Sequence, residues 1–501
     1  MTSQQHYEQV QKLSRDTRIL QGIFSLLDWD QETYMPADAA GIRAEQRKLI
    51  AGLSHKGLVG RPFTNALSKL IDLKTGRILS KKLSEPQQAS LRMWRRDYTH
   101  AKALPKSFVE EEAELSSQSM NAWHHAKQDD AFQQFAPFLE KQIALARKKA
   151  EYLGYKDHPY NALLDQYEPG ATCAEINALF TPLRAHITKL VKTVQAKPPV
   201  DDNFLFGKFP YDSQMKFGLF VLDAMKYDLK KGRLDISGHP FSSSAHPYDS
   251  RITTRIDTTS VMSNVSAVMH EAGHAFYEMG LPVEQYGTPL GDAISLGMHE
   301  SQSRWWETRI GLSKPFWNHF LPHLQQHFKG KFDHISLDQF YRAINKVIPC
   351  MIRIESDEVT YGLHIILRYE LELALIEGSL SVRDLPEAWN AKMKELLGLT
   401  PKSNREGCLQ DIHWSMGAFG YFPTYTLGNL YAGHLFQAFE RDHTDWEKRV
   451  AKGDLSFIKE WLTQSVHQYG RQYSSKELLL KVTGKPFTAD AYTKYLTKKH
   501  G

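Results

Sequence analysis

Residues 260–282 have the sequence SVMSNVSAVMHEAGHAFYEMGLP, and this stretch decides how the whole chain is interpreted. Thr259 or Ser260 can cap a helix start, because a hydroxyl oxygen accepts a hydrogen bond from a free amide of the first turn. Gly280 followed by Pro282 is typical of a helix end. The sequence therefore predicts a helix of roughly five to six turns in this segment.

This predicted helix contains the motif His270-Glu271-Ala272-Gly273-His274. Residues four positions apart share one face of a helix, so both imidazoles can reach one metal ion. Glu271 points to the side of that ion, where it can accept a proton from a water molecule that the ion activates. The motif predicts a metal-dependent peptidase with His270 and His274 as ligands and Glu271 as the general base.

A catalytic zinc usually takes a third protein ligand and leaves one position open. Glu300 lies 26 residues beyond His274, which leaves room for a loop and a returning helix. Its neighbour His299 faces another way on a helix, so we interpret it as a supporting or packing residue. Glu307 is the alternative ligand, and Asp292 is a candidate partner for the ligand imidazoles.

The composition is that of an ordinary globular protein. Hydrophobic residues make up 42% and charged residues 24% of the 501 positions, so a core can form. The formal net charge of +5 is spread along the chain, which argues against a nucleic-acid partner. Cys173, Cys350 and Cys408 lie far apart, which favours a reducing compartment. A polar N-terminus without a long apolar run predicts a cytoplasmic protein with no membrane partner.

Helical patterns dominate the remaining sequence. Apolar residues recur at helical spacing from Phe132 to Ile143, and Gly154 can end that helix. Ser107 and Glu110 have the spacing of a capping box at a helix start. A further amphipathic helix is predicted from Arg353 to Leu375.

One segment predicts strands. Alternating β-branched residues in Arg251–Ile256, separated by turn residues from His239-Pro240-Phe241, indicate a β-hairpin. We therefore expect a single, predominantly α-helical catalytic domain over residues 1–501 with a small sheet beside the motif helix. Within it, a helical N-terminal part runs to about residue 230, and the catalytic part covers about residues 231–501.

Several segments together resemble the carboxypeptidase Taq family of HExxH metallocarboxypeptidases. The resemblance covers most of the chain, and its ordered elements are more specific than the HExxH motif alone. The matching segments are Trp29–Pro36, Leu163–Gly170, His239–Phe241, Asp249–Thr253, His270–His274, His299–Gln302, Gly407–Trp414 and Gly420–Tyr425. One element departs, because Ser356 stands where the family usually has alanine, although Arg353 and Asp357 are intact.

The resemblance implies an all-α fold with a deep active-site groove, similar to neurolysin-like peptidases. It implies release of single residues from the free C-termini of peptides with broad specificity. It also implies Glu300 as the third ligand, one divalent metal per chain and a homodimer. Zinc is the expected metal, and cobalt is the alternative.

Hydrolysis also needs a donor for the oxyanion and a cation for the substrate carboxylate. Tyr421 and His413 are the candidate donors, because both carry a donor and lie in matching segments. Arg251 and Arg353 are the first candidates for binding the substrate carboxylate, and Arg255 is the next candidate. Each arginine can instead serve a structural salt bridge, and Asp357 is a candidate partner for Arg353. The remaining candidate substrate-binding residues are His239, Asp249 and Thr253.

The strand around Arg251 can also pair with the substrate backbone as an added strand. Two other functions remain open. An oligoendopeptidase or dipeptidyl-carboxypeptidase can use the same metal helix. A helical binding scaffold without catalysis is a third interpretation, but it gives no reason for Glu271 beside two ligands.

Overall fold

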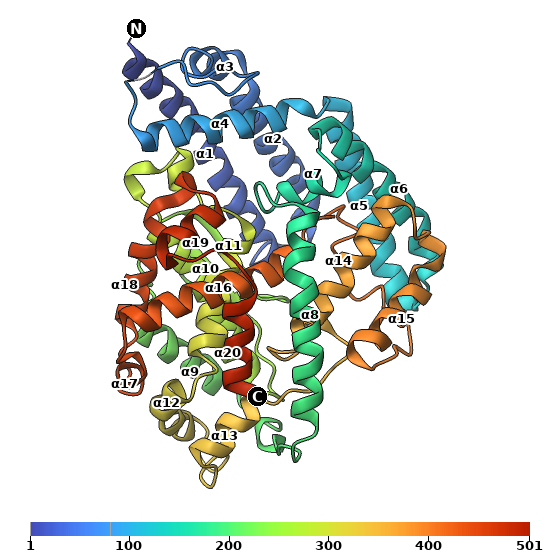
Figure 1. Ribbon diagram of the computed structural model, residues 1–501, viewed down its shortest axis with the longest axis vertical. Helices are drawn as coiled ribbons and strands as arrows, with labels where there is room; N and C mark the ends of the chain where they lie inside the picture. The colour runs from blue at the N-terminus through green and yellow to red at the C-terminus, as the bar shows by residue number, and fades with distance from the viewer. Residues whose placement is uncertain (1, 81) are drawn as a thin grey trace.

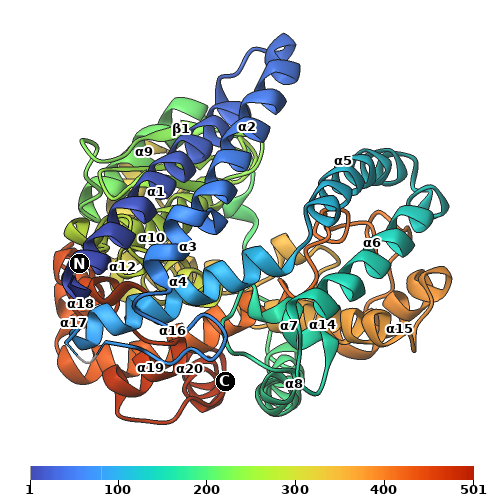
Figure 2. The ribbon, with the colours of Figure 1, turned by 90° about the horizontal axis from the view of Figure 1, so that it is seen from above.

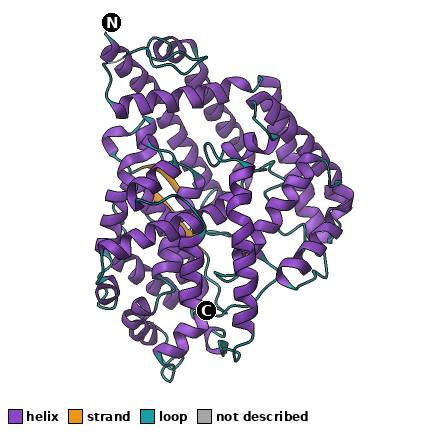
Figure 3. Cartoon of the chain, viewed as in Figure 1, coloured by secondary structure: helices purple, strands orange, loops and turns teal. Residues whose placement is uncertain are grey.

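The computed structural model describes residues 2–80 and 82–501, and almost all of their regular structure is helical (Figures 1 and 3). This confirms the predicted all-α fold class. The helices are α1 (Ser3–Thr33), α2 (Ala40–Val59), α3 (Arg61–Leu67), α4 (Glu85–Ala103), α5 (Lys106–Asp129), α6 (Phe132–Leu153), α7 (Pro159–Asp165), α8 (Cys173–Gln195), α9 (Tyr211–Ala224), α10 (Val261–Gly280), α11 (Leu296–Arg304), α12 (Lys314–His327), α13 (Leu337–Ile344), α14 (Tyr361–Glu377), α15 (Leu385–Leu397), α16 (Pro423–Asp442), α17 (Trp446–Val450), α18 (Ser456–Ser465), α19 (Ser475–Thr483) and α20 (Asp490–His500).

Two helix boundaries differ from the sequence prediction. α6 ends before Gly154, as expected. α5, however, starts directly after Pro105, so Ser107 already lies inside the helix and the predicted capping box of Ser107 and Glu110 is wrong. The helix predicted from Arg353 starts only at Tyr361. Asp357 explains the late start, because its carboxylate accepts hydrogen bonds from the amides of the residues just before α14.

The small sheet has three strands, β1 (Leu234–Ile236), β2 (Ser242–His246) and β3 (Asp249–Thr254). The hairpin of β2 and β3 is confirmed, but residues 239–241 form the turn before β2 rather than a strand, and β1 was not predicted. The strand order is β1-β3-β2, with β1 parallel and β2 antiparallel to β3. Both edges of β3 are therefore occupied, so the expected substrate pairing along β3 is wrong.

Two apolar cores hold the helices together. The smaller core joins α1, α3 and α4, and the larger core draws side chains from Trp123 to Leu496. Figure 2 shows α1 with α2 and α5 with α6 as neighbouring pairs on opposite sides of the molecule. The larger core crosses residue 230, which favours one domain, although that interpretation stays a prediction. None of the described helices is long and apolar enough to cross a membrane.

The motif helix α10 begins and ends where the sequence predicts. Ser260 occupies the N-cap position, although its side chain makes no capping hydrogen bond. The middle of α10 packs against α11 through Gly273. A Cβ atom at this glycine would lie 2.5 Å from the backbone oxygen of Gln302 and 2.6 Å from Cα of Ser303. Any larger side chain would therefore force the two helices apart.

We predict that Gly273→Ala destabilises the protein by about 1–3 kcal/mol, the usual effect of overpacking against a rigid neighbour. The neighbour here is backbone, which cannot rotate away. Differential scanning calorimetry of both proteins measures the shift in Tm. Gly52→Ala is the matched control, because Gly52 lies in exposed α2 with no atom near its added methyl group. That control should gain about 0.5–1 kcal/mol, and an equal Tm for Gly273→Ala and wild type would contradict the packing argument.

Candidate metal centre

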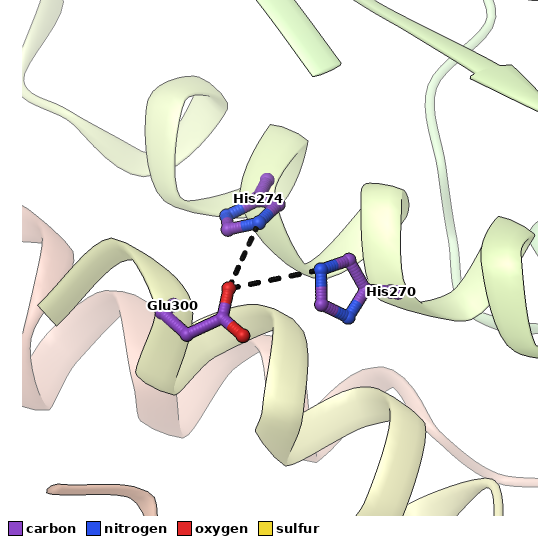
Figure 4. A group of neighbouring side chains, drawn as sticks. All are labelled: His270, His274 and Glu300. Carbon is purple, nitrogen blue, oxygen red and sulfur yellow. Dashed lines mark ion pairs between the residues drawn. The ribbon is translucent and has the colours of Figure 1, made fainter. Parts of the chain in front are cut away.

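The three predicted ligands come together where α10 passes α11 (Figure 4). His270 and His274 project from α10, and Glu300 projects toward them from α11. Oε2 of Glu300 lies 3.7 Å from Nε2 of His270 and 3.5 Å from Nε2 of His274. Ligand atoms about 2 Å from a zinc ion are separated by about 3–4 Å. The three side chains therefore have the spacing that one ion requires.

Glu300 is held in this position from two sides. At the start of α11, Ser295 accepts a hydrogen bond from the amide of Met298, and Glu168 accepts one from Gly297. Behind Glu300 lies Gly428 of α16, where a Cβ atom would come within 2.6 Å of Cγ of Glu300. The glycine gives Glu300 the space to lie between α16 and α10.

The imidazole of His270 is oriented by Glu307. Nδ1 of His270 lies 2.8 Å from Oε2 of Glu307, and Nη1 of Arg304 donates to the same oxygen over 2.7 Å. Glu307 belongs to a π-helical turn, η5 (Trp305–Ile310), that continues α11. Because Nδ1 donates to a carboxylate, Nε2 is the nitrogen of this ring that faces Glu300, and it can bind a metal ion once it loses its proton. This geometry favours a supporting role for Glu307 over its role as the alternative ligand.

A second chain of contacts orients His274. Its Nδ1 lies 2.6 Å from Nδ1 of His299, and Nε2 of His299 lies 3.0 Å from Glu278. When His274 donates a hydrogen bond to His299 and His299 donates one to Glu278, Nε2 of His274 is again free for a metal. His299 thus lies where the sequence interpretation expects a supporting residue. Asp292 does not contact the imidazoles, because it pairs with Arg18 at 3.1 Å, so that prediction is wrong.

Burial and neighbouring charges shift the pKa of each group. Burial opposes a charge on Glu300, but His270 and His274 lower its pKa to about 2. Burial also opposes a charge on His270, but Glu300 and Glu307 raise its pKa to about 9. Burial lowers the pKa of His274 to about 4 and raises that of Glu271 to about 7. Carboxylates thus favour positive charge at the site.

This donor set fits a divalent transition metal. Two imidazole nitrogens and one carboxylate oxygen form the catalytic pattern of several zinc peptidases, and cobalt or manganese accepts the same donors. Both imidazoles present the same ring nitrogen, and their other nitrogens are already engaged. The side chains are therefore already placed to hold an ion, whose binding displaces the proton from Nε2 of His270.

An aromatic cluster lies beside Glu300. Nε2 of His413 lies 3.2 Å from the hydroxyl of Tyr425, and the rings of Tyr421 and His413 are 5.2 Å apart. Burial, followed by the charge of Glu300, raises the pKa of Tyr421. Both predicted oxyanion donors thus belong to one cluster, and sequence reasoning missed Tyr425. The sequence carried no helical signal for this pairing, because Tyr421 lies just before α16 and Tyr425 lies in its first turn.

Arg353 packs against this cluster, 5.0 Å from the ring centre of Tyr425, and its ion-pair partner differs from the predicted one. Nε and Nη2 of Arg353 donate to Oδ1 of Asp411 over 3.0 and 2.8 Å, whereas Asp357 caps the start of α14. Arg368 donates to the other oxygen of Asp411 over 2.6 Å. Two buried cations therefore share one carboxylate, and the remaining Nη1 of Arg353 contacts the hydroxyl of Tyr361 over 3.3 Å.

The other predicted substrate-binding residues lie in or beside the sheet. Arg251 pairs with Asp249 over 2.7 Å and stacks on Trp29 of α1, 4.4 Å from the ring centre. Thr253 is buried, and its hydroxyl bonds to the hydroxyl of Ser237 and accepts from the amide of Phe241, beside the ends of the neighbouring strands. His239 lies in the turn before β2, where Nδ1 contacts the carbonyl of the next residue. Among the described hydrogen bonds and ion pairs, none joins these residues to the metal ligands.

Comparison with known proteins identifies relatives over the full length of the chain. A family model described as carboxypeptidase Taq (M32) metallopeptidase matches residues 9–500. The chain is 39% identical to thermostable carboxypeptidase 1 of Thermus thermophilus, over 100% of this chain and 99% of that protein. It is 37% identical to carboxypeptidase 1 of Bacillus subtilis, over 95% and 94%. The crystal structure of an M32 carboxypeptidase from Deinococcus radiodurans matches with a TM-score of 0.95 and 34% identity, covering 99% of both chains.

We predict that Glu307→Gln weakens metal affinity by about 10- to 100-fold, because the loss of a carboxylate partner reduces the basicity of a ligand imidazole. Competition with a fluorescent chelator measures this affinity. Glu460→Gln, at an exposed position of α18, is the charge-matched control and should bind metal like the wild type. If Glu307→Gln binds metal as tightly as this control, Glu307 does not support the site.

Proposed function

Because the chain belongs to the carboxypeptidase Taq (M32) family of metallopeptidases, we propose that it releases single amino acids from the free C-termini of peptides, with broad side-chain specificity. The observation that carries this proposal is the cluster of His270, His274 and Glu300, with Glu271 close enough for the charges of His270 and Glu300 to act on it. We assign the three clustered residues as metal ligands and Glu271 as the general base.

A divalent ion held by these ligands would polarise the scissile carbonyl and make a water molecule more acidic. Glu271 takes the proton of the attacking water and returns it to the leaving amine. Burial raises the pKa of Glu271 above that of an exposed carboxyl group, which makes the carboxylate a better base toward the attacking water. We propose zinc as the metal, with cobalt as the alternative, because availability decides between ions at such a site.

The oxyanion of the tetrahedral intermediate requires a donor near the metal. We assign this donor to Tyr421, whose hydroxyl belongs to the cluster beside Glu300. Burial lowers the pKa of His413 to about 3, although the charge of Asp411 acts in the opposite direction. This imidazole therefore stays neutral. A neutral His413 next to the hydroxyl of Tyr425 can orient the aromatic cluster or donate one hydrogen bond itself.

The substrate carboxylate requires a cation, and the Arg353 and Arg368 pair supplies one. A single carboxylate, Asp411, faces both guanidinium groups, so one positive charge is left in excess beside the aromatic cluster. Arg353 can direct Nη1 toward a substrate, because Tyr361 is the one residue of the described chain that accepts a hydrogen bond from that nitrogen. Arg251 is the weaker candidate, because Asp249 already accepts from two of its nitrogens.

We also infer a homodimer in the cytoplasm. The homodimer rests on the family resemblance alone. The three cysteines are free thiols in the structure, which agrees with a reducing compartment. Analytical ultracentrifugation tests the dimer independently of the activity.

We predict that the metal-loaded protein shortens an N-blocked pentapeptide by one residue at a time from its C-terminus, and that a chelator stops the reaction. Mass spectrometry of a time course identifies the products. Removal of dipeptides would indicate a dipeptidyl-carboxypeptidase, and internal cleavage would indicate an oligoendopeptidase. Glu271→Gln should lose about 10²- to 10⁴-fold in kcat, the range of general acid–base catalysis, while it retains the metal.

The same peptide with a C-terminal amide is the control for carboxylate recognition. It should react much more slowly, because an amide cannot pair with the Arg353 and Arg368 cluster. Glu284→Gln, at an exposed position after α10, controls for loss of a glutamate and should keep full activity. Equal rates on the free and amidated peptides would contradict release from free C-termini.

A further inference from the structure

Both candidate oxyanion donors, His413 and Tyr421, lie in the segment of turns that joins α15 to α16. The described residues 398–422 contain no helix or strand. The two rings are nevertheless close together, with their centres 5.2 Å apart. Because no ladder or helical turn fixes the backbone here, contacts with neighbouring elements must determine where the two side chains lie.

A carboxylate of α14, Glu372, contacts this segment beside each of the two donors. Its side chain is fully buried. Oε1 accepts a hydrogen bond over 2.8 Å from Nε1 of Trp414, the residue after His413. Oε2 accepts one over 3.1 Å from the amide of Gly420, the residue before Tyr421. One carboxylate therefore holds the immediate neighbour of each candidate donor.

The turn at Gly420 leaves Tyr421 little freedom. Gly420 has a φ of +89°, in the left-handed region that favours glycine. A Cβ atom at this position would lie 2.6 Å from the backbone carbon of Leu163, so the turn packs directly on α7. Tyr160 of α7 also donates to Oε2 of Glu372 over 2.5 Å. The turn, α7 and α14 therefore meet at this carboxylate.

In the described part of the chain, three hydrogen bonds rather than an ion pair stabilise Glu372. Arg368 acts on it only weakly, because Arg368 pairs with Asp411 over 2.6 Å. Burial raises the pKa of Glu372 to about 7, although the hydrogen bonds act in the opposite direction. A buried charged group often stabilises a fold no more than an apolar side chain would, but a fully bonded network fixes the direction of its members. Glu372 is therefore better suited to fix geometry than to add stability.

We propose that Glu372 is a positioning residue for the peptidase reaction, which holds Tyr421 where the oxyanion forms. This role rests on the proposed function, because it takes Tyr421 as the oxyanion donor. Among the described hydrogen bonds and ion pairs, none joins Glu372 to His270, His274 or Glu300. Glu372 therefore acts on the formation of the tetrahedral intermediate, and its loss should lower kcat with little change in KM or in metal affinity.

Steady-state kinetics of metal-loaded Glu372→Gln on the N-blocked pentapeptide test this role. A glutamine amide has a single acceptor oxygen, so either Trp414 or Gly420 faces its NH2 group and loses an acceptor. We expect kcat to fall by about 10- to 100-fold, the effect of a misplaced reacting group. KM and the metal affinity, measured by competition with a chelator, should stay close to the wild-type values. Unchanged kcat in the folded variant overturns the proposal.

Tyr160→Phe is the matched control for general destabilisation. It removes a hydrogen bond to the same carboxylate but keeps the two bonds from Trp414 and Gly420. This variant should lower the Tm and keep the wild-type kcat. If Tyr160→Phe loses as much kcat as Glu372→Gln, the loss follows from weakened packing, and the positioning role is wrong.

A double-mutant cycle with Tyr421→Phe shows whether Glu372 acts through this tyrosine. Tyr421→Phe alone should lose about 10²- to 10³-fold in kcat, the effect of removing one oxyanion donor. Glu372→Gln should cause no further loss in that background. Losses that multiply overturn the role of Glu372, and so does full kcat in Tyr421→Phe.

The wild-type protein keeps the two levels of the test apart. If it releases single residues from the pentapeptide while the cycle fails, the proposed function stands and only the role of Glu372 is lost. Where Glu372→Gln does not fold, Trp414→Phe takes its place in the cycle, because it removes only the indole donor to the same carboxylate. The same non-additive loss of kcat is then expected, and additive losses again contradict the role.

Discussion

The close approach of α10 and α11 is the constraint on which the rest of the structure depends. Gly273 leaves no side chain between them, so the backbones come near enough for Glu300 to reach both imidazoles. Gly428 of α16 completes the arrangement from the other side of Glu300. Two glycines thus set the spacing of the metal site, because helices approach this closely only where a Cβ atom is absent.

Buried polar residues from distant parts of the chain then fix this geometry. Glu168 accepts hydrogen bonds from Tyr431, Ser475 and the amide of Gly297, so it ties the start of α11 to α16 and α19. Glu372 accepts bonds from Tyr160, Trp414 and the amide of Gly420, and thereby holds the loop that precedes Tyr421. Segments that lie hundreds of residues apart in the sequence therefore stabilise the same site, because their side chains and amides form hydrogen bonds with one another.

The sequence predicted the helical fold, the bounds of α10 and the grouping of His270, His274 and Glu300, because helical spacing and the family resemblance are strong local signals. The sequence could not show which residues far apart in the chain form ion pairs or hydrogen bonds. Arg353 pairs with Asp411 rather than with nearby Asp357, since proximity in sequence says little about tertiary contacts. The order of the sheet was equally hidden, because β1 shows too few residues for an alternating pattern to be recognised.

Anomalous diffraction from crystals of the protein grown with zinc locates the metal relative to His270, His274 and Glu300. We predict one strong zinc peak per chain, about 2 Å from Nε2 of His270, Nε2 of His274 and a carboxylate oxygen of Glu300. A peak bound by Glu307 in place of Glu300, or one located away from both imidazoles, would contradict the proposed metal centre and the mechanism built on it.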